Sequence, residues 1–209
     1  MKIAINGFGR IGRLFFRQAF GREGFDIVAI NDLGDVANLA YLLKYDSVYG
    51  RWDHDVKADT ATNTLIVDGK TIQFVGEKEM TKLPWKKFGI DIALEATGLA
   101  ESFEKARAHV DAGAKRVIIT APAKDAEQKD ARTILNGVNE DLFQSTLVSS
   151  NGSCTTNSVS PILQILSETI GVKKAFLNTT HGYTATQNLV DGPVKGHDFR
   201  RGRAGGVNI

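Results

Sequence analysis

Three glycines, Gly7, Gly9 and Gly12, follow the first apolar run of the chain, Lys2–Asn6, and open a segment with helical spacing. A G-x-G-x-x-G arrangement in this position is typical of the turn between the first strand and the first helix of a doubly wound sheet. The first glycine permits the tight turn, the second lets the backbone approach a pyrophosphate, and the third lets helix and strand pack closely. The sequence therefore predicts an α/β domain with a dinucleotide site at its first turn, against the alternative of an ordinary tight turn.

An acidic residue stands at the place where such a site needs one. Asp32 lies twenty residues beyond Gly12 and directly follows a second predicted strand, Ile27–Asn31. A carboxylate there accepts hydrogen bonds from both hydroxyls of an adenosine ribose and repels a 2′-phosphate. The pattern therefore favours NAD over NADP as the cofactor, although an acid after a strand is also a common loop or capping residue.

Short β-rich runs alternate with helical segments up to about residue 150. This rhythm predicts a parallel sheet covered by helices, that is, a Rossmann-type fold. The further strands predicted are Ile92–Thr97, Arg116–Thr120 and Thr146–Ser150, with a hairpin over Thr64–Val75. The helices are predicted from the apolar sets Ile11, Leu14, Phe15 and Ala19; Val36, Leu39, Ala40 and Leu43; and Phe103, Ala106 and Val110, the last ending at Gly113.

The pattern changes near residue 151. A helical spacing runs from Val159 to Ile170, and Pro161 inside it predicts a late helix start or a kink. A long β-like run, Lys174–Thr184, and a Gly- and Arg-rich segment follow. We therefore expect two domains: residues 1–152 bind the dinucleotide, and residues 153–209 form the incomplete start of an α+β catalytic domain.

Composition disfavours several other classes of protein. A hydrophobic fraction of 42% with 24% charged residues is typical of a folded globular chain, and a net charge of +2 gives no reason to expect nucleic acid or a membrane surface as a partner. We find no signal-peptide pattern and no long apolar run, so we expect no membrane association. The basic Lys195–Arg203 segment is interpreted as a loop with local phosphate and subunit contacts rather than an RNA-binding module.

The one cysteine of the chain favours a cytoplasmic protein. Cys154 lies among Ser, Thr and Asn residues between a strand end and a helix-forming stretch, where a helix dipole favours a thiolate. His181 is the candidate base that would pair with it, and the alternative is a buried structural thiol. Spacing alone leaves open whether the two side chains meet.

The other histidines are weaker candidates. His54 is interpreted as a solvated loop residue, and His109 is expected on the polar face of a helix. His197 lies in the basic segment near the end of the sequence. No Cys/His cluster has the spacing of metal ligands, so no metal is predicted.

Several motifs together resemble one family, the phosphorylating glyceraldehyde-3-phosphate dehydrogenases, over all 209 residues. The matching segments occur in the family's order: INGFGRIGR, AINDL, LLKYDSVYG, EATG, VIITAPAKD, GVNED, SNGSCTTN, HGYTATQ and DGP. The pair SCTTN and HxYTATQ is the most specific. The resemblance implies an NAD-dependent enzyme of glycolysis and gluconeogenesis, a homotetramer in the cytoplasm.

The resemblance also implies a mechanism. The Cys154 thiolate would attack the aldehyde of glyceraldehyde 3-phosphate, and His181 would accept the hydroxyl proton as hydride passes to the nicotinamide. Inorganic phosphate would then attack the thioester and give 1,3-bisphosphoglycerate. Ser153 and Thr155 match the family's contacts to inorganic phosphate, and Thr184 and Thr186 its contacts to the substrate phosphate.

The cofactor residues implied by the resemblance lie in the first domain. Leu33 and Pro193 match the NAD-preferring members of the family, and Lys78 stands where an arginine often supports the adenine. The residues that match NAD contacts are Asn6, Gly7, Gly9, Arg10, Ile11, Gly12 and Asp32, with Thr97, Gly98 and Thr120 on the nicotinamide side.

Besides Lys78, the chain departs from the family pattern in several places. Ser158 replaces a second cysteine that many members carry, which should leave catalysis intact. The family also continues beyond this sequence, so we expect a C-terminally truncated fragment with at most weak NAD binding and no activity by itself. Erythrose-4-phosphate dehydrogenase and a non-catalytic NAD-binding fragment, including one that binds nucleic acid or another partner, are the alternatives. The first tends to lack the TAPAKD and YTATQ stretches present here. A non-phosphorylating NADP-dependent aldehyde dehydrogenase lacks this motif set.

Overall fold

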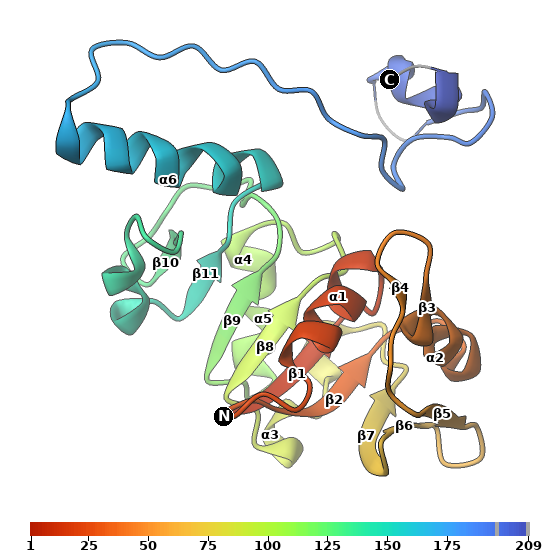
Figure 1. Cartoon of the computed structure of the whole chain (residues 1–209). Coiled ribbons are helices and arrows are strands. Elements are labelled where there is room, and N and C mark those ends of the chain that lie inside the picture. The colour runs from red at the N-terminus through yellow and green to blue at the C-terminus, as the bar shows by residue number, and fades with distance from the viewer. Residues whose placement is uncertain (195–196, 208–209) are drawn as a thin grey trace. The chain divides into compact units, whose positions relative to one another are not determined.

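The computed structural model describes residues 1–194 and 197–207. The chain divides into two compact units, Met1–Thr169 and Ile170–Ile209. The first unit is a mixed sheet with helices on both faces, and the second is mostly without regular secondary structure (Figure 1). The predicted α/β class is therefore confirmed.

The sheet of the first unit has nine strands. They are β1 (Lys2–Asn6), β2 (Asp26–Asn31), β5 (Val56–Asp59), β6 (Thr64–Val67), β7 (Lys70–Val75), β8 (Ile92–Glu95), β9 (Arg116–Ile119), β10 (Ala131–Thr133) and β11 (Val148–Ser150). Their spatial order is β10-β11-β9-β8-β1-β2-β7-β6-β5, and the strands from β10 to β7 run parallel. A separate pair is formed by β3 (Tyr45–Asp46) and β4 (Gly50–Arg51).

The five predicted strands and the hairpin are all present, with ends shifted by up to two residues. In the hairpin between β6 and β7, Asp68 and Gly69 have φ of 48° and 80°. Two successive positive φ angles are what a two-residue type I′ turn requires. The short strands β5 and β10 were not predicted from the sequence.

Strand β1 lies at the centre of the nine-stranded sheet, between β2 and β8. The chain winds outward from β1 in both directions, so the strand order reverses there. A crevice forms at the carboxyl ends of parallel strands at such a reversal, and ligands of doubly wound folds bind in it. The predicted glycine turn follows β1 at this point.

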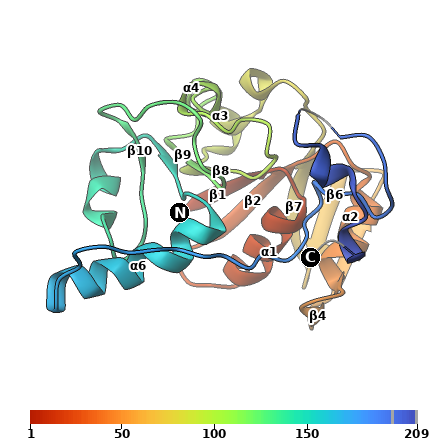
Figure 2. The same cartoon turned by 90° about the horizontal axis from the view of Figure 1, so that it is seen from above.

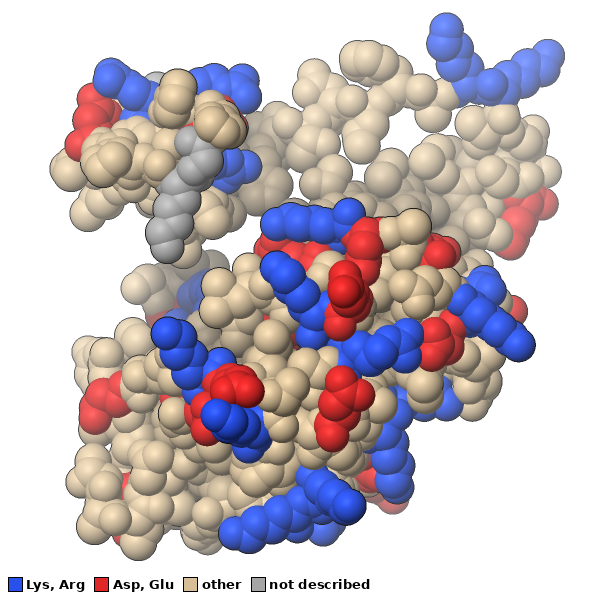
Figure 3. Space-filling model, turned by 180° about the vertical axis from the view of Figure 1, so that it is seen from behind, with Lys and Arg blue, Asp and Glu red and all other residues tan. Residues whose placement is uncertain are grey.

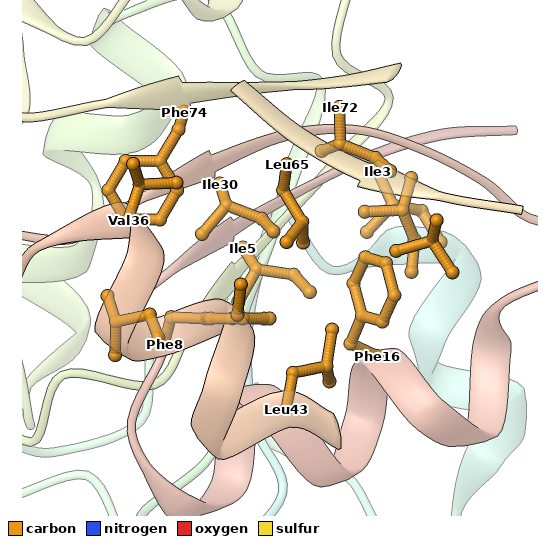
Figure 4. Close-up of a cluster of buried hydrophobic side chains, with 14 of the residues drawn as sticks. Ile3, Ile5, Phe8, Phe16, Ile30, Val36, Leu43, Leu65, Ile72 and Phe74 are labelled. Carbon is orange, nitrogen blue, oxygen red and sulfur yellow. The ribbon is translucent and has the colours of Figure 1, made fainter. Parts of the chain in front are cut away.

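Two hydrophobic clusters, one on each face of the sheet, form the core. Helices α1 (Arg10–Ala19) and α2 (Val36–Lys44) pack on the first cluster, which Figure 4 shows around Ile5, Phe16 and Leu43. The opposite face is covered by three short helices: α3 (Trp85–Phe88), α4 (Phe103–Ala106) and α5 (Ala108–Asp111). Figure 2 shows α1 on one side of the sheet and α3 and α4 on the other. Short 3₁₀ helices span Met80–Lys82 and Glu140–Ser145.

The set of residues predicted to face the core from the first helix was partly wrong. Helix α1 buries Gly12, Phe16 and Ala19, whereas Ile11 is half exposed. The close approach of Gly12 to the turn rotates the helix so that Phe16, one turn further along, faces the sheet. In α2, by contrast, all four predicted apolar residues are buried.

Helix α6 (Cys154–Thr169) begins earlier than its apolar pattern. The side-chain oxygen of Ser153 accepts a hydrogen bond from the backbone N–H of Thr156 at 2.9 Å, which satisfies one of the donors in the first turn. Of the two expectations for Pro161, a late helix start is therefore wrong, because Pro161 lies inside the helix. A kink stays a prediction. The prediction of a helix that ends before Gly171 is confirmed.

The second unit contains the short 3₁₀ helices Phe199–Gly202 and Gly205–Val207. The predicted strand Lys174–Thr184 does not form, because a strand needs a hydrogen-bonded neighbour and the described part of the chain places none beside this run. Lys195 and Gly196, which the sequence analysis included in a phosphate-contacting loop, lie outside the described residues.

Charged side chains of both signs are interspersed on the face that Figure 3 shows, rather than gathered by sign. Within the described residues, ten ion pairs join a lysine or arginine to an aspartate or glutamate, including Lys70 with Asp26 and Arg107 with Asp130. Over residues 1–194 and 197–207, no helix has both the length and the apolar character needed to cross a membrane.

Candidate functional site: a dinucleotide pocket and a cysteine helix

The turn between β1 and α1 depends on two of its three glycines. Gly7 has a φ of 91°, and a Cβ added there would lie 2.6 Å from backbone atoms of Ala96. A Cβ on Gly12 would lie 2.1 Å from the carbonyl oxygen of Gly7. A Cβ on Gly9 would meet no described atom within 4 Å. The first and third glycines are therefore required by the turn and by packing, as predicted, and the open side of Gly9 leaves room for a ligand.

Asp32 joins the end of β2 to this turn. Its Oδ2 accepts a hydrogen bond from the Phe8 backbone N–H at 2.6 Å, and its Oδ1 accepts one from the Gly34 backbone N–H at 2.8 Å. An ionised carboxyl group offers about four acceptor positions, so the two oxygens can accept further hydrogen bonds from a ligand. The carboxylate is thus held in place at the position predicted for a ribose contact.

The N-terminus of α1 faces the same turn. Within the described residues this helix has no acidic residue in its first turn and no side-chain cap. The Arg10 side chain pairs with Asp46, and its guanidinium lies 5.4 Å from the ring centre of Tyr49. Backbone N–H groups and the helix dipole, rather than the Arg10 side chain, are therefore what this end of the helix offers to an anion.

A pocket of about 320 Å³ lies at the carboxyl ends of β1, β2 and β8. Six of the predicted cofactor residues line it: Asn6, Gly7, Gly9, Asp32, Lys78 and Thr97. Leu33, which was predicted to mark NAD preference, lines it as well. Five further residues of the pocket lining were not predicted from the sequence: Asn31, Glu77, Met80, Ala96 and Leu99. A polar residue at the end of a buried strand, such as Asn31, was the available sequence signal.

The remaining predicted cofactor residues lie around this pocket. Gly98, with a φ of 71°, stands between two lining residues. Ile11 lies half exposed in the first turn of α1 beside Arg10 and Gly12. Thr120 follows β9, and its hydroxyl donates a hydrogen bond to the backbone carbonyl of Glu95 at 3.0 Å. The turn thus has the shape, the N–H donors and the acid that an adenine dinucleotide needs.

His109 does not lie on a polar helix face, and that prediction is wrong. Its side chain is fully buried, with Nε2 2.8 Å from Glu95 Oε2 and Nδ1 2.9 Å from the Trp85 indole nitrogen. Helix α5 is a single turn pressed against the sheet, and the buried carboxylate beneath it provides a polar partner inside the core. His54 lies in a loop, as predicted, with its Nδ1 2.6 Å from Asp68 Oδ2.

Cys154 is the first residue of α6 and is exposed. The preceding loop is tied to the helix by the Asn157 side-chain amide, which donates to the carbonyls of Asn151 at 2.6 Å and Ser153 at 2.9 Å. Thr155 follows in the first turn and is half-buried. The predicted nucleophile therefore stands at a helix N-terminus, where the helix dipole and backbone N–H groups favour an anion.

The second unit places two of the predicted residues, His181 and Thr184, in the lining of one cavity. Its volume is about 680 Å³, and it is lined by His181, Gly182, Thr184, Gln187, Asp198, Arg200, Arg201 and Arg203. The hydroxyl of Thr186 accepts a hydrogen bond from Arg201 Nη1 at 2.8 Å and lies 3.1 Å from the hydroxyl of Thr184. None of the arginines of this unit was predicted as a site residue. Hydroxyls beside arginines are suited to a phosphate.

His181 itself is exposed, with Nδ1 2.6 Å from the backbone carbonyl oxygen of Gly182, a contact in which Nδ1–H is the donor. Cys154 belongs to the first unit and His181 to the second, so their pairing stays a prediction. Among the described residues, no group of three or more His, Cys, Asp or Glu side chains is arranged to hold a metal ion.

Comparison with protein families gives two matches. Residues 1–103 match the family described as "Glyceraldehyde 3-phosphate dehydrogenase, NAD binding domain". Residues 153–209 match the family described as "Glyceraldehyde 3-phosphate dehydrogenase, C-terminal domain".

Curated relatives carry the same name. A glyceraldehyde-3-phosphate dehydrogenase of Haemophilus influenzae is 46% identical over 209 residues, which is 100% of this chain and 60% of the relative. That of Thermotoga maritima is 48% identical over 212 residues, covering 100% of this chain and 61% of the relative. Glyceraldehyde-3-phosphate dehydrogenase B of Aspergillus oryzae is 44% identical, with 100% and 60% covered. The chain thus spans about three fifths of the length of these relatives.

Proposed function

Because the chain belongs to the glyceraldehyde-3-phosphate dehydrogenase family, we propose that it supplies the cofactor site and the reactive cysteine of an NAD-dependent, phosphorylating dehydrogenase. The observation that carries the proposal is the pocket at the centre of the sheet, which combines the glycine turn with Asp32. Residues 1–152 are assigned to the NAD-binding domain and 153–209 to the N-terminal part of the catalytic domain. The family match that begins at residue 153 supports this division.

NAD is the cofactor, and when bound it accepts a hydride at its nicotinamide ring. The glycine turn and the N-terminus of α1 would hold its pyrophosphate, and Asp32 its adenosine ribose. Lys78 would lie toward the adenine, and Thr97, Gly98 and Thr120 toward the nicotinamide. The full set proposed to contact NAD is Asn6, Gly7, Gly9, Arg10, Ile11, Gly12, Asp32, Lys78, Thr97, Gly98 and Thr120.

Cys154 is assigned as the nucleophile and His181 as its base. The Cys154 thiolate adds to the aldehyde carbon of glyceraldehyde 3-phosphate, and the N-terminus of α6 stabilises the oxyanion that forms. The protonated His181 then donates a proton to this oxygen and completes the hydroxyl of the thiohemiacetal. His181 accepts the hydroxyl proton as the hydride leaves that carbon, and the O–H electron pair completes the carbonyl of a thioester. Inorganic phosphate then adds to the thioester carbon, the thiolate departs, and 1,3-bisphosphoglycerate is released.

Two groups of hydroxyls are assigned to phosphate. Ser153, just before α6, and Thr155, in the first turn of that helix, would bind the attacking inorganic phosphate. Thr184 and Thr186 would bind the phosphate of the substrate, and the hydrogen bond from Arg201 to Thr186 supports an anion there.

The oligomeric state and the cellular compartment of the protein are proposed from its resemblance to the family. We assign the chain to a homotetramer in the cytoplasm with a role in glycolysis and gluconeogenesis. The single cysteine of the sequence supports a reducing compartment.

Substrate choice tests the proposed reaction. The chain, extended with the C-terminal residues of a relative, is assayed for NADH formation with glyceraldehyde 3-phosphate or erythrose 4-phosphate, with and without inorganic phosphate. We expect higher kcat/KM with glyceraldehyde 3-phosphate and a requirement for phosphate. A preference for erythrose 4-phosphate, or NAD binding without turnover of either sugar, would refute the proposed reaction.

A further inference from the structure

A row of buried polar side chains runs beneath the dinucleotide pocket. Asn31 on β2, Asn6 on β1 and Glu95 on β8 are in register across three neighbouring strands, and all three are buried. Asn31 Nδ2 donates to Asn6 Oδ1 at 2.7 Å, and Asn6 Nδ2 donates to Glu95 Oε2 at 2.6 Å. Asn31 Oδ1 accepts from the backbone N–H of Glu77 at 2.9 Å. Since each amide has both donor and acceptor partners, its orientation is determined.

The row ends at Trp85, which belongs to the second hydrophobic cluster. The indole nitrogen of Trp85 can only donate a hydrogen bond, and it lies 2.9 Å from His109 Nδ1. Nδ1 must therefore be the acceptor, so His109 is neutral and carries its proton on Nε2. That Nε2–H donates to Glu95 Oε2 at 2.8 Å. Both Trp85 and His109 are fully buried.

Glu95 is consequently held as an anion without a cationic partner among the described residues. Its Oε2 accepts from Asn6 and His109, and its Oε1 accepts from the backbone N–H of Thr97 at 2.9 Å and from the Thr97 hydroxyl. Burial alone would raise the pKa of Glu95, but the hydrogen bonds from His109, Thr97 and Asn6 outweigh it and hold the pKa below its ordinary value. These partners stabilise the charge through dipoles and do not neutralise it.

The strand order places this charge on one side of the pocket. Asp32 follows β2, the glycine turn follows β1, and Glu95 ends β8 on the other side of β1. A dinucleotide with its adenosine at Asp32 and its pyrophosphate at the glycine turn therefore extends its nicotinamide half toward the end of β8. Glu95 also positions the residues there, because its carboxylate holds Thr97 and its backbone carbonyl holds Thr120.

We propose that Glu95, kept anionic by the neutral His109 that Trp85 orients, is a positioning residue of the NAD pocket whose charge favours NAD⁺ over NADH. The inference rests on the proposed NAD site. The oxidised nicotinamide ring carries one more positive charge than the reduced ring, and a buried carboxylate attracts it through a medium of low effective dielectric constant. The same carboxylate holds the pocket wall for both forms of the cofactor.

The ratio of the dissociation constants for NAD⁺ and NADH distinguishes an effect of the Glu95 charge from an effect of Glu95 on the structure of the pocket. NAD⁺ and NADH are titrated by calorimetry into this chain, into Glu95→Gln and into the control Glu104→Gln, which removes an exposed carboxylate of α4. We expect Glu95→Gln to weaken NAD⁺ binding roughly threefold or more beyond its effect on NADH. Glu104→Gln should leave the ratio unchanged. A loss of affinity that is equal for NAD⁺ and NADH in Glu95→Gln would overturn the inference.

A second measurement needs no variant at position 95. Nitrogen-15 NMR of the chain at neutral pH should show His109 as a neutral imidazole with its proton on Nε2, and carbon-13 NMR should show an ionised Glu95 carboxyl. A doubly protonated His109 or a protonated Glu95 would contradict the proposal. Failure of the unsubstituted chain to bind NAD⁺ would refute the cofactor site and the inference with it. Binding with an unchanged ratio in Glu95→Gln would refute the inference alone.

Discussion

The side-chain amide of Asn6 donates a hydrogen bond of 2.6 Å to the carboxylate of Glu95, across the junction between β1 and β8. Both residues are almost fully buried, and both lie at the carboxyl ends of their strands. The two halves of the sheet are therefore joined below the cofactor pocket by a buried polar contact. Losing one partner would leave the other buried and unsatisfied.

Acid stability should depend on this carboxylate. The pKa of Glu95 is lower in the folded chain than its ordinary value of 4.5, so its ionised form stabilises the fold above that pH. This contribution is lost as the pH falls through the folded-state pKa. We expect the free energy of unfolding to fall less between about pH 5 and about pH 3 in Glu95→Gln than in the unsubstituted chain. Urea unfolding at each pH measures this, and equal pH dependence in both proteins would contradict it.

The glycine turn yields a prediction with a built-in control. Gly12→Ala would force a Cβ to 2.1 Å from the Gly7 carbonyl oxygen, and we expect it to destabilise the chain by about 2 kcal/mol or more. Gly9→Ala meets open space in the described structure and should keep the fold's stability. It should nevertheless weaken NAD binding, because the added methyl group blocks the backbone from the pyrophosphate. Denaturant unfolding and calorimetry separate the two effects, and unchanged NAD affinity in Gly9→Ala would argue against the proposed binding mode.

Cofactor discrimination should reside in Asp32. A 2′-phosphate beside this carboxylate would be repelled, so we expect NAD to bind at least about tenfold more tightly than NADP. Asp32→Asn removes the charge and should reduce that preference. The matched control is Asp35→Asn, since Asp35 caps α2 outside the pocket lining and asparagine caps helices equally well. Equal affinities for NAD and NADP in the unsubstituted chain would show that Asp32 does not select the cofactor.

The arginine beside the threonines should bind the substrate phosphate. Arg201 donates to the Thr186 hydroxyl at 2.8 Å and lines the cavity that contains His181 and Thr184. In the chain extended with a relative's C-terminal residues, Arg201→Ala should raise the KM for glyceraldehyde 3-phosphate about tenfold, as expected for one lost charge-assisted hydrogen bond. Arg22→Ala, an exposed arginine of the first unit, is the control. Similar KM values in the two variants would remove Arg201 from the site.

Much of the first unit was predictable because its signals are local. The strands are short apolar runs, the Asp68-Gly69 hairpin uses a turn with a clear sequence preference, and the glycine turn is demanded by contacts between neighbouring elements. The exposure of Ile11 was not predictable, because the rotation of α1 is decided by the close approach of Gly12 to the turn.

The buried network and the second unit were less accessible from the sequence. The sequence pattern predicts His109 on the polar face of a helix, because its buried partners Glu95 and Trp85 come from other parts of the chain and contact it only in the fold. The run Lys174–Thr184 has the composition of a strand, but composition cannot supply a neighbouring strand. The arginines near Thr186 lack a local motif, so only the fold of the second unit brings them together with it.

The requirement for Cys154 tests the central claim most directly. In the chain extended with a relative's C-terminal residues, NADH formation from glyceraldehyde 3-phosphate, NAD and phosphate is measured before and after Cys154→Ser, with Ser158→Ala as the control on the same helix. The account predicts phosphate-dependent turnover that Cys154→Ser abolishes and Ser158→Ala preserves, with NAD affinity little changed in both. Turnover that persists in Cys154→Ser, or that proceeds equally well without phosphate, would contradict it.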